Sequence, residues 1–373
     1  MTTLRKRHAG FSLLEVMIGV MIGMIGIVVI FQSLQIWESR KRTTASGSDA
    51  QVAGTLGMFN LERDLRLAGF GFGKSTYMGC TVSAYDTTGR GAFTFPLVPV
   101  QIVDGGAAGP DQIISLHGNS AIYTDTQNFT LSSVSSKKAQ TSRNGYQVND
   151  VIVAAGNTFP PGDCAMAQVS GLTNADGLTV DHLGLRYNAP AGTVPLAAPT
   201  GSGAGSFTAG VLFNLGPTPQ RMMWRVSGNV LSWSEDIGAS GTWNDVAEGI
   251  VDLQAEYGID TNNDGQIASA EWTSTAPMAA NWLNLRAIRV ALLARSQQYE
   301  KPGVDAANVA THVTPNLPTW TGSATSPFVV KNLDGSAGTG TPANPADHWK
   351  NYRYRVYEEV IPLRNVIWGM QAS

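Results

Sequence analysis

The sequence predicts an α+β protein in which one long N-terminal helix carries a β-rich head. The first observation is an apolar run over residues 11–31, whose only strongly polar members are Ser12 and Glu15. The second is that short apolar segments bounded by Gly, Pro, Asn and Asp fill the chain from residue 74 onward. Because such segments are typical of strands joined by turns, we expect an antiparallel β-sheet head over residues 74–373.

The helix is expected to cover residues 11–73, and residues 11–31 are long and apolar enough to cross a bilayer. Beyond this span, apolar residues recur at spacings of three and four, which indicates an amphipathic helix lying on the head: Val52, Leu56 and Phe59, with Met58, Leu61, Leu65 and Ala68. Glycines within and after this pattern are expected to weaken and then end the helix: Gly47, Gly54, Gly57 and the alternating glycines of 69–73.

The composition argues against two classes of function. The 373-residue chain carries a net charge of −3, and beyond its first 42 residues no Lys/Arg cluster is dense enough to follow a phosphate backbone. We therefore expect no nucleic-acid partner. The five histidines are scattered, and no nucleophile-elbow or zinc motif accompanies them, so we expect no enzymatic activity.

The charges around the apolar run predict its orientation. Arg5, Lys6 and Arg7 precede the run, so the first ten residues should stay in the cytoplasm and the head should lie outside it. A cleaved signal peptide or a plain single-span anchor would be the ordinary alternatives. Neither explains Glu15, because a carboxylate inside the hydrocarbon is costly without a partner.

Residues 6–15, KRHAGFSLLE, resemble a type IV prepilin leader: a short basic peptide ending in Gly, followed by Phe, Ser, Leu and a Glu at the fifth position. The resemblance implies that a prepilin peptidase removes residues 1–10 by cleavage after Gly10 and that Phe11 is N-methylated. In an assembled pilus, the Glu15 carboxylate would then pair with the Phe11 amine of a neighbouring subunit and set its register.

The head is expected to contain at least eight strands, and the sequence VSGNV at 226–230 predicts a tight hairpin between two of them. Two low-complexity stretches, 189–210 and 335–345, are expected to be surface loops. The expected strands are Gln112–His117, Asp150–Ala154, Ala165–Val169, Arg221–Val226, Val230–Trp233, Ile250–Ile259, Arg286–Ala294 and Tyr352–Ile361.

Short motifs along the head, taken in order together with the leader, resemble the PilW-type minor pilins: LRLAGF at 65–70, GC at 79–80, GDCA at 162–165, LLARS at 292–296, YRYR at 352–355 and PLRN at 362–365. The resemblance implies a type IV pilin-like fold, with a membrane-spanning helical spine and a head enlarged by β-rich insertions. It implies a role in pilus assembly within a priming or tip complex, with other minor and major pilins and the inner-membrane assembly platform as partners.

The expected location is the inner membrane with a periplasmic head, followed by the extracellular pilus. There are two alternatives. One is a pseudopilin of a type II secretion system, which uses the same leader and spine, and the other is a calcium-dependent tip adhesin, in which the head is the working part and serves cell adhesion. In each of these locations the head lies outside the cytoplasm, where oxidation is permitted. The two cysteines, Cys80 and Cys164, should therefore form a disulfide.

One segment of the head has the spacing of a calcium-binding loop. Asp260, Asn262, Asp264 and Glu271 occupy the first, third, fifth and twelfth positions of a twelve-residue loop, and the Gln266 carbonyl occupies the seventh. This pattern predicts one bound Ca²⁺. The preceding residues look like a strand rather than the entering helix of an EF-hand, so a simple hairpin turn is the alternative.

Overall fold

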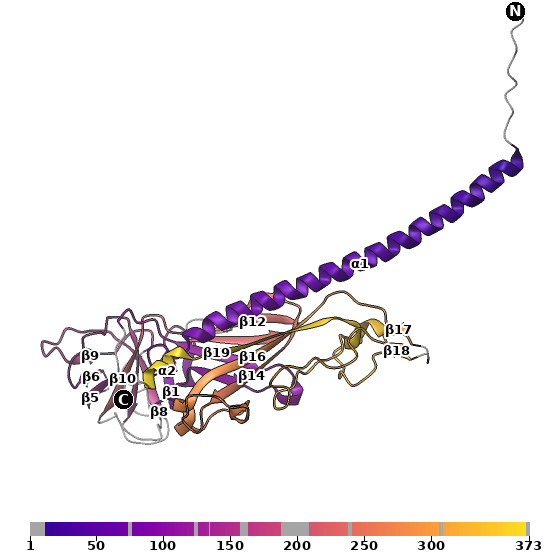
Figure 1. The fold of residues 1–373 in the computed structure, drawn as a ribbon. Coiled ribbons are helices and arrows are strands. Elements are labelled where there is room, and N and C mark those ends of the chain that lie inside the picture. Colours follow the sequence, from indigo (N-terminus) through magenta and orange to yellow (C-terminus); the bar gives the residue numbers. More distant parts are fainter. Residues whose placement is uncertain are drawn as a thin grey trace, which may run out of the picture.

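The computed structural model describes residues 12–73, 77–122, 126–133, 135–156, 163–187, 209–237, 241–305, 307 and 309–370. A single long helix enters the head along one side, and its N-terminal half extends away from the head (Figure 1). Within the head, the strands form three main sheets and one small hairpin. The predicted α+β, pilin-like architecture is therefore confirmed.

The helix α1 runs without interruption from Leu13 to Leu67 and is about 82 Å long at ~1.5 Å per residue. It ends before residue 73 because Gly69 adopts a left-handed conformation, with φ of +82°. The Asn365 side-chain amide donates to the carbonyls of Leu67 and Ala68, at 3.0 and 3.2 Å. The C-terminal part of the chain thus supplies the cap that ends α1.

The remaining elements follow in chain order. The strands of the first half are β1 (Thr81–Asp86), β2 (Gly91–Pro96), β3 (Val100–Val103), β4 (Gln112–His117), β5 (Gln127–Ser132), β6 (Ser136–Ala139), β7 (Val151–Gly156), β8 (Asp163–Gln168), β9 (Thr179–Asp181) and β10 (Gly210–Gly216). Those of the second half are β11 (Gln220–Ser227), β12 (Val230–Glu235), β13 (Asn244–Glu248), β14 (Ile250–Ile259), β15 (Trp272–Thr273), β16 (Leu285–Arg295), β17 (Gly303–Val304), β18 (Ala310–Thr311) and β19 (Tyr354–Pro362). A short helix, α2 (Arg364–Met370), and five 3-10 turns complete the fold: Gly106–Ala108, Ser269–Glu271, Ala279–Asn284, Pro345–Asp347 and Trp349–Asn351.

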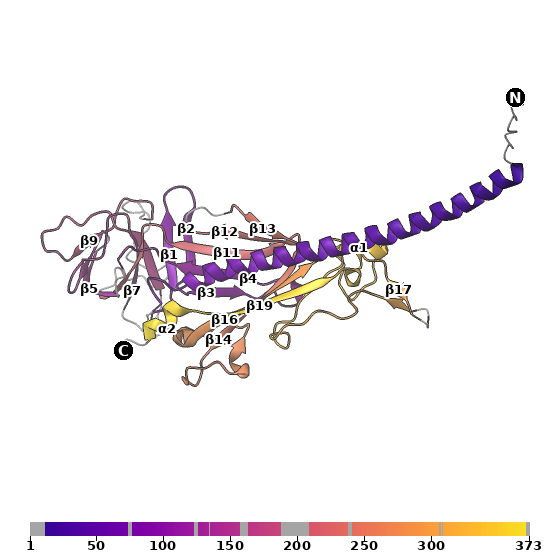
Figure 2. The same ribbon diagram turned by 45° about the horizontal axis from the view of Figure 1, so that its top comes forward.

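The three main sheets differ in how they lie relative to α1. The distal sheet, with strand order β2-β1-β8-β7-β10-β5-β6-β9, lies at the end of the head opposite the N-terminus (Figures 1 and 2). The central sheet has the order β13-β12-β11-β4-β3, and the C-terminal sheet has the order β15-β14-β16-β19. Neighbouring strands are antiparallel except β1 and β8, which pair in parallel. The C-terminal half of α1 packs mainly on the C-terminal sheet and also touches the central one.

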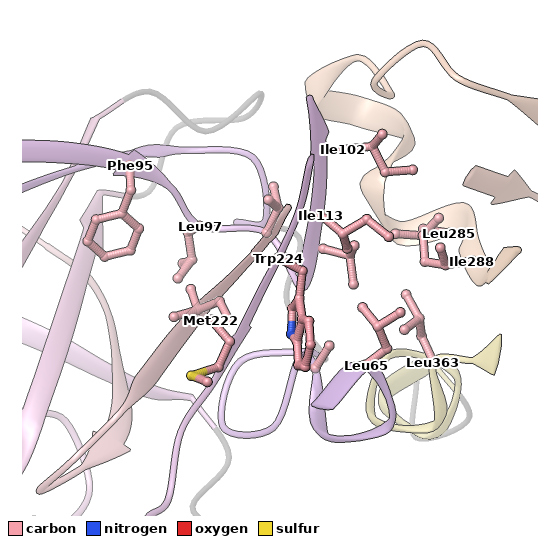
Figure 3. Close-up of a cluster of buried hydrophobic side chains, with 14 of the residues drawn as sticks. Leu65, Phe95, Leu97, Ile102, Ile113, Met222, Trp224, Leu285, Ile288 and Leu363 are labelled. Atoms are coloured by element: carbon pink, nitrogen blue, oxygen red, sulfur yellow. The ribbon is translucent and has the colours of Figure 1, made fainter. Parts of the chain in front are cut away.

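The main hydrophobic core lies where α1 meets the two sheets. Figure 3 shows Leu65 of α1 and Leu363 beside Trp224 of β11, with Leu285 and Ile288 of β16 next to them. All five side chains are buried. Of the predicted amphipathic pattern, Met58, Leu61, Leu65 and Ala68 are buried and stabilise the head through apolar burial. Val52, Leu56 and Phe59 are exposed, so the prediction was wrong for these three residues.

The glycines that follow α1 join the core to the distal sheet. The Gly69 amide donates to the Leu116 carbonyl at 2.9 Å, and the Gly118 amide donates to the Phe70 carbonyl at 2.8 Å. The Asn119 amide then donates to Leu215 of β10 at 2.7 Å. This backbone network fixes the distal sheet directly at the C-terminal end of the spine.

All eight predicted strands are present, and β4 and β14 have the predicted bounds. The hairpin at 226–230 is confirmed by Gly228 and Asn229, which adopt φ of 60° and 64° as a tight turn requires. The predicted loop over 189–210 lies mostly outside the described residues, and its last residue, Gly210, begins β10 instead of belonging to a loop. That part of the prediction was wrong because β10 is buried along its whole length and shows no alternating pattern.

Candidate functional site

The N-terminal half of α1 is the part of the chain whose composition suits a membrane. The stretch Leu13–Glu38 is long and apolar enough to cross a membrane, and it is the only such stretch in the described part of the chain. Glu15 lies in the first turn of α1 with its side chain exposed. Gly10 and Phe11 lie outside the described residues, so processing at this bond stays a prediction.

Two glycines let the C-terminal half of α1 approach the head closely. A Cβ atom at Gly54 would meet the Tyr357 ring of β19, whose Cζ would lie 2.6 Å away. The Tyr357 hydroxyl donates to the Gln51 carbonyl one turn earlier, at 3.1 Å. At Gly57, a Cβ atom would lie 2.9 Å from a methyl group of Leu231. Low helix propensity predicts weak points here, but the structure shows that both positions are contact points.

A polar contact fixes the same helix inside the core. Trp224 Nε1 donates to Asp64 Oδ2 at 3.2 Å, and both side chains are buried. Burial raises the pKa of Asp64, while the nearby Arg63 opposes this shift. The indole thus satisfies a carboxylate that would otherwise be costly to bury in the helix–sheet interface.

The same half of α1 carries a second apolar face, which points away from the head. This outer stripe consists of Val52, Leu56, Phe59 and Leu67, which are 45–63% exposed. Their spacing places them on one side of the helix. Apolar side chains at this exposure on a helix are suited to contact with another subunit.

The predicted disulfide is present. Cys80 and Cys164 are bonded, their Cα atoms are 5.9 Å apart, and they are separated by 84 positions in the sequence. Cys164 lies on β8, beside the first strand that follows Cys80. Both cysteines are buried in the main core. The bond therefore joins the entry into the distal sheet to one of its inner strands.

The loop over 260–271 is closed by hydrogen bonds to its own carboxylates. Asp260 accepts the amides of Asp264 and Gly265 at 3.1 and 3.0 Å. Glu271 accepts the Thr261 amide at 2.8 Å and the Ala268 amide at 2.9 Å. The Thr261 hydroxyl also donates to Glu271, and this bond is the largest cause that lowers the pKa of the Glu271 carboxyl, followed by the two amide bonds.

The predicted calcium ligands do not all converge. Asp260 is fully buried and forms an ion pair with Arg286 of β16, at 3.0 Å. Asn262 donates to Asp264 at 3.0 Å, so these two side chains also hold each other. Among the described residues, no three Asp, Glu, His or Cys side chains form a group that could hold a metal ion. The oxygen donors suit calcium chemically, but Arg286 already supplies Asp260 with a counter-charge.

Comparison with protein families gives two matches on different parts of the chain. Residues 5–31 match the prokaryotic N-terminal methylation motif, which includes Gly10, Phe11 and Glu15. Residues 216–365 match the type IV pilus-assembly protein W family. Together, these two matches are those of a PilW-like pilin with a prepilin leader. No curated protein matches the chain.

The family match covers a defined part of this pilin's structure. Residues 216–365 comprise β11 to β19 and the first residues of α2, and thus most of the two sheets on which α1 packs. The match begins at the last residue of β10, so the distal sheet lies almost entirely outside it.

Three contacts of this site were not predicted from the sequence: the packing of Tyr357 on Gly54, the helix cap by Asn365, and the pairing of Arg286 with Asp260. The first two contacts join residues about 300 positions apart in the sequence; Asn365 and Leu67, for example, are 298 positions apart. The sequence held one signal for the first contact. Glycines inside a helix destabilise it, so their presence at Gly54 and Gly57 indicates positions where another element packs closely against the helix.

Proposed function

We propose that this pilin is a minor pilin that acts in type IV pilus assembly, within a priming or tip complex. The observation that supports this role most strongly is the position of the distal sheet, at the end of the head farthest from the membrane span (Figure 1). In a filament whose subunits stack through their helices, the neighbour toward the tip would lie at this end. A subunit at the tip has no such neighbour, so an enlarged distal end is tolerated there.

The two apolar parts of α1 support assembly through this helix. The exposed span Leu13–Glu38 and the outer stripe would be covered by other pilins once the subunit leaves the membrane. In this scheme, the prepilin peptidase cleaves after Gly10, and Glu15 pairs with the methylated amine of Phe11 on the next subunit. Glu15→Ala should therefore insert into the membrane but fail to enter pili, whereas Glu38→Ala, at the end of the span, serves as a matched control.

Co-purification tests this proposal against the pseudopilin alternative. The mature protein, without residues 1–10, should appear in sheared pili, and deletion of its gene should reduce the number of pili per cell. Mass spectrometry of that material should find a methylated Phe11 as the first residue. Recovery with an outer-membrane secretin complex instead, with normal piliation of the deletion strain, would favour the type II secretion pseudopilin.

A second candidate function is a calcium-dependent tip adhesin, and the loop over 260–271 is the feature that favours it. The loop offers oxygen donors from Asp260, Asp264 and Glu271, already oriented by backbone amides. Calcium would have to compete with Arg286 for Asp260 and draw Glu271 inward, so weak binding is expected.

Thermal melting of the full-length protein in calcium and in chelator tests this candidate. Calcium binding predicts a higher Tm in calcium, which Glu271→Gln should abolish. Equal melting in both conditions would mean that the loop is a turn closed by its own hydrogen bonds and the Arg286–Asp260 ion pair, without calcium.

A further inference from the structure

A cleft of about 360 Å³ opens in the pilin head, away from the features described above. One wall is the turn between β11 and β12, at Gly228 and Asn229. The other wall is the segment 329–335, and Val251 of β14 and Arg295 of β16 contribute from the C-terminal sheet. The cleft therefore lies where the central sheet, the C-terminal sheet and a long loop meet.

This cleft lies at the end of the head that faces the membrane span. The strand β19 runs parallel to α1, because Tyr357 contacts Gln51 while Asn365 contacts Leu67. Arg295 pairs with Tyr354, the first residue of β19, and so lies at the N-terminal end of this arrangement. The same end of the head points toward the free half of α1 in both views (Figures 1 and 2).

The charged side chains that line the cleft are both cations. Arg295 is half-buried, and its Nε is buried with no hydrogen-bond partner. Its guanidinium lies 5.1 Å from the centre of the Tyr352 ring and hydrogen-bonds with the Tyr354 side chain. Within the described ranges it forms no ion pair. Lys331 is exposed at the rim, and no Asp or Glu lines the cleft.

A half-buried guanidinium whose charge no carboxylate neutralises favours an anion beside it. A carboxylate matches the planar fork of arginine and can accept two parallel hydrogen bonds from it. The remaining walls include Val226, Val330 and Leu333, which would contact the hydrocarbon part of a peptide. Basic and apolar surfaces thus occur together in a cleft large enough for a short chain segment.

We propose that this cleft binds an acidic segment of a neighbouring pilin, whose carboxylate pairs with Arg295 and Lys331. This inference rests on the proposed function, because in a growing pilus the next subunit is added at the membrane-facing end of the head. The tip complex would thereby select the pilin that follows it through one carboxylate and its apolar neighbours. A small anion such as phosphate would fill the charge requirement but would not use the apolar walls.

Peptide binding to the full-length protein in detergent tests the proposal directly. The probe is a fluorescein-labelled pentapeptide of alternating valine and glutamate, and the control peptide carries glutamine in place of glutamate. We expect only the glutamate peptide to bind. Arg295→Gln should raise its Kd by about tenfold or more, and Lys331→Gln by a few-fold. Lys301→Gln, an exposed lysine outside the cleft, should leave the Kd unchanged.

Equal binding of the two peptides, or a Kd unaffected by Arg295→Gln and Lys331→Gln, would overturn the proposal. Binding of inorganic phosphate without binding of the peptide would also overturn it. Lys331 is exposed, so its substitution tests the cleft even if the Arg295 variant folds poorly. Because the titration needs no pilus, its result is independent of where the pilin lies in the filament.

Discussion

Replacing Gly54 by alanine should separate the stability of the helix from the stability of its docking on the head. The added Cβ atom would overlap the Tyr357 ring, whose Cζ would lie 2.6 Å away. The ring must therefore swing outward or α1 must shift. Either movement breaks the hydrogen bond from the Tyr357 hydroxyl to the Gln51 carbonyl.

Three contributions determine the size of the effect. Overpacking of a close contact costs about 1–3 kcal/mol. Loss of the hydrogen bond adds about 1 kcal/mol, while the higher helix propensity of alanine returns about 1 kcal/mol. The last two contributions nearly cancel, so we expect Gly54→Ala to lower the free energy of unfolding by about 1–3 kcal/mol. Gly47→Ala is the matched control, because a Cβ placed there would have no atom within 4 Å apart from its chain neighbours and the adjacent backbone of α1. It should be neutral or stabilising by up to about 1 kcal/mol.

Thermal or denaturant unfolding of the full-length protein in detergent, followed by tryptophan fluorescence, measures both variants. The buried Trp224 makes this signal sensitive to docking of α1, because its indole donates to Asp64 of the helix. If Gly54→Ala is as stable as the wild type or more stable, the helix tolerates a side chain at this position and the docking argument is wrong.

Three further predictions concern the cap, the disulfide and the pH dependence of stability. Asn365→Ala should cost about 1–2 kcal/mol in denaturant unfolding, because two carbonyls at the end of α1 lose their donor. Reduction of Cys80–Cys164 should destabilise the head by about 4–5 kcal/mol in the chain-entropy model, and an unchanged melting curve in reductant would contradict this. Burial raises the pKa of Asp252 from 3.8 to about 7. Between these two pH values the folded state binds more protons than the unfolded state, so the stability that this group contributes is lost as pH rises from 3.8 to 7. Burial lowers the pKa of His182 to about 3, so the stability that His182 contributes is instead lost as pH falls below 6.5. In urea titrations at several pH values, Asp252→Asn should remove the loss of stability with rising pH that comes from Asp252 and leave the His182 dependence unchanged.

The sequence predicted the parts of the fold whose signals are local. The strand Ile250–Ile259 and the hairpin turn at Gly228 and Asn229 combine apolar runs with turn residues, so their positions follow from neighbouring residues alone. The distal sheet was harder to predict. The strand β5 is short, largely polar and paired with β10, which lies about 80 positions later in the chain.

In the candidate site, too, the features with a local sequence signal were predicted and those that depend on distant residues were not. The disulfide could be predicted because an oxidising location leaves two cysteines with one possible pairing. The spacing of the loop at 260–271 predicted its carboxylates, but Arg286 pairs with Asp260 from another strand, 26 positions away. A single sequence indicates which residue types lie near one another along the chain. It does not indicate which distant side chain supplies the counter-charge.

The position of this pilin in the filament is the most direct test of its proposed role. Antibodies raised against the distal sheet, applied to intact pili and viewed by electron microscopy, should label one end of each filament and leave the shaft unlabelled. Labelling distributed along the shaft would contradict a tip position, because the distal sheet would then have to fit between stacked subunits.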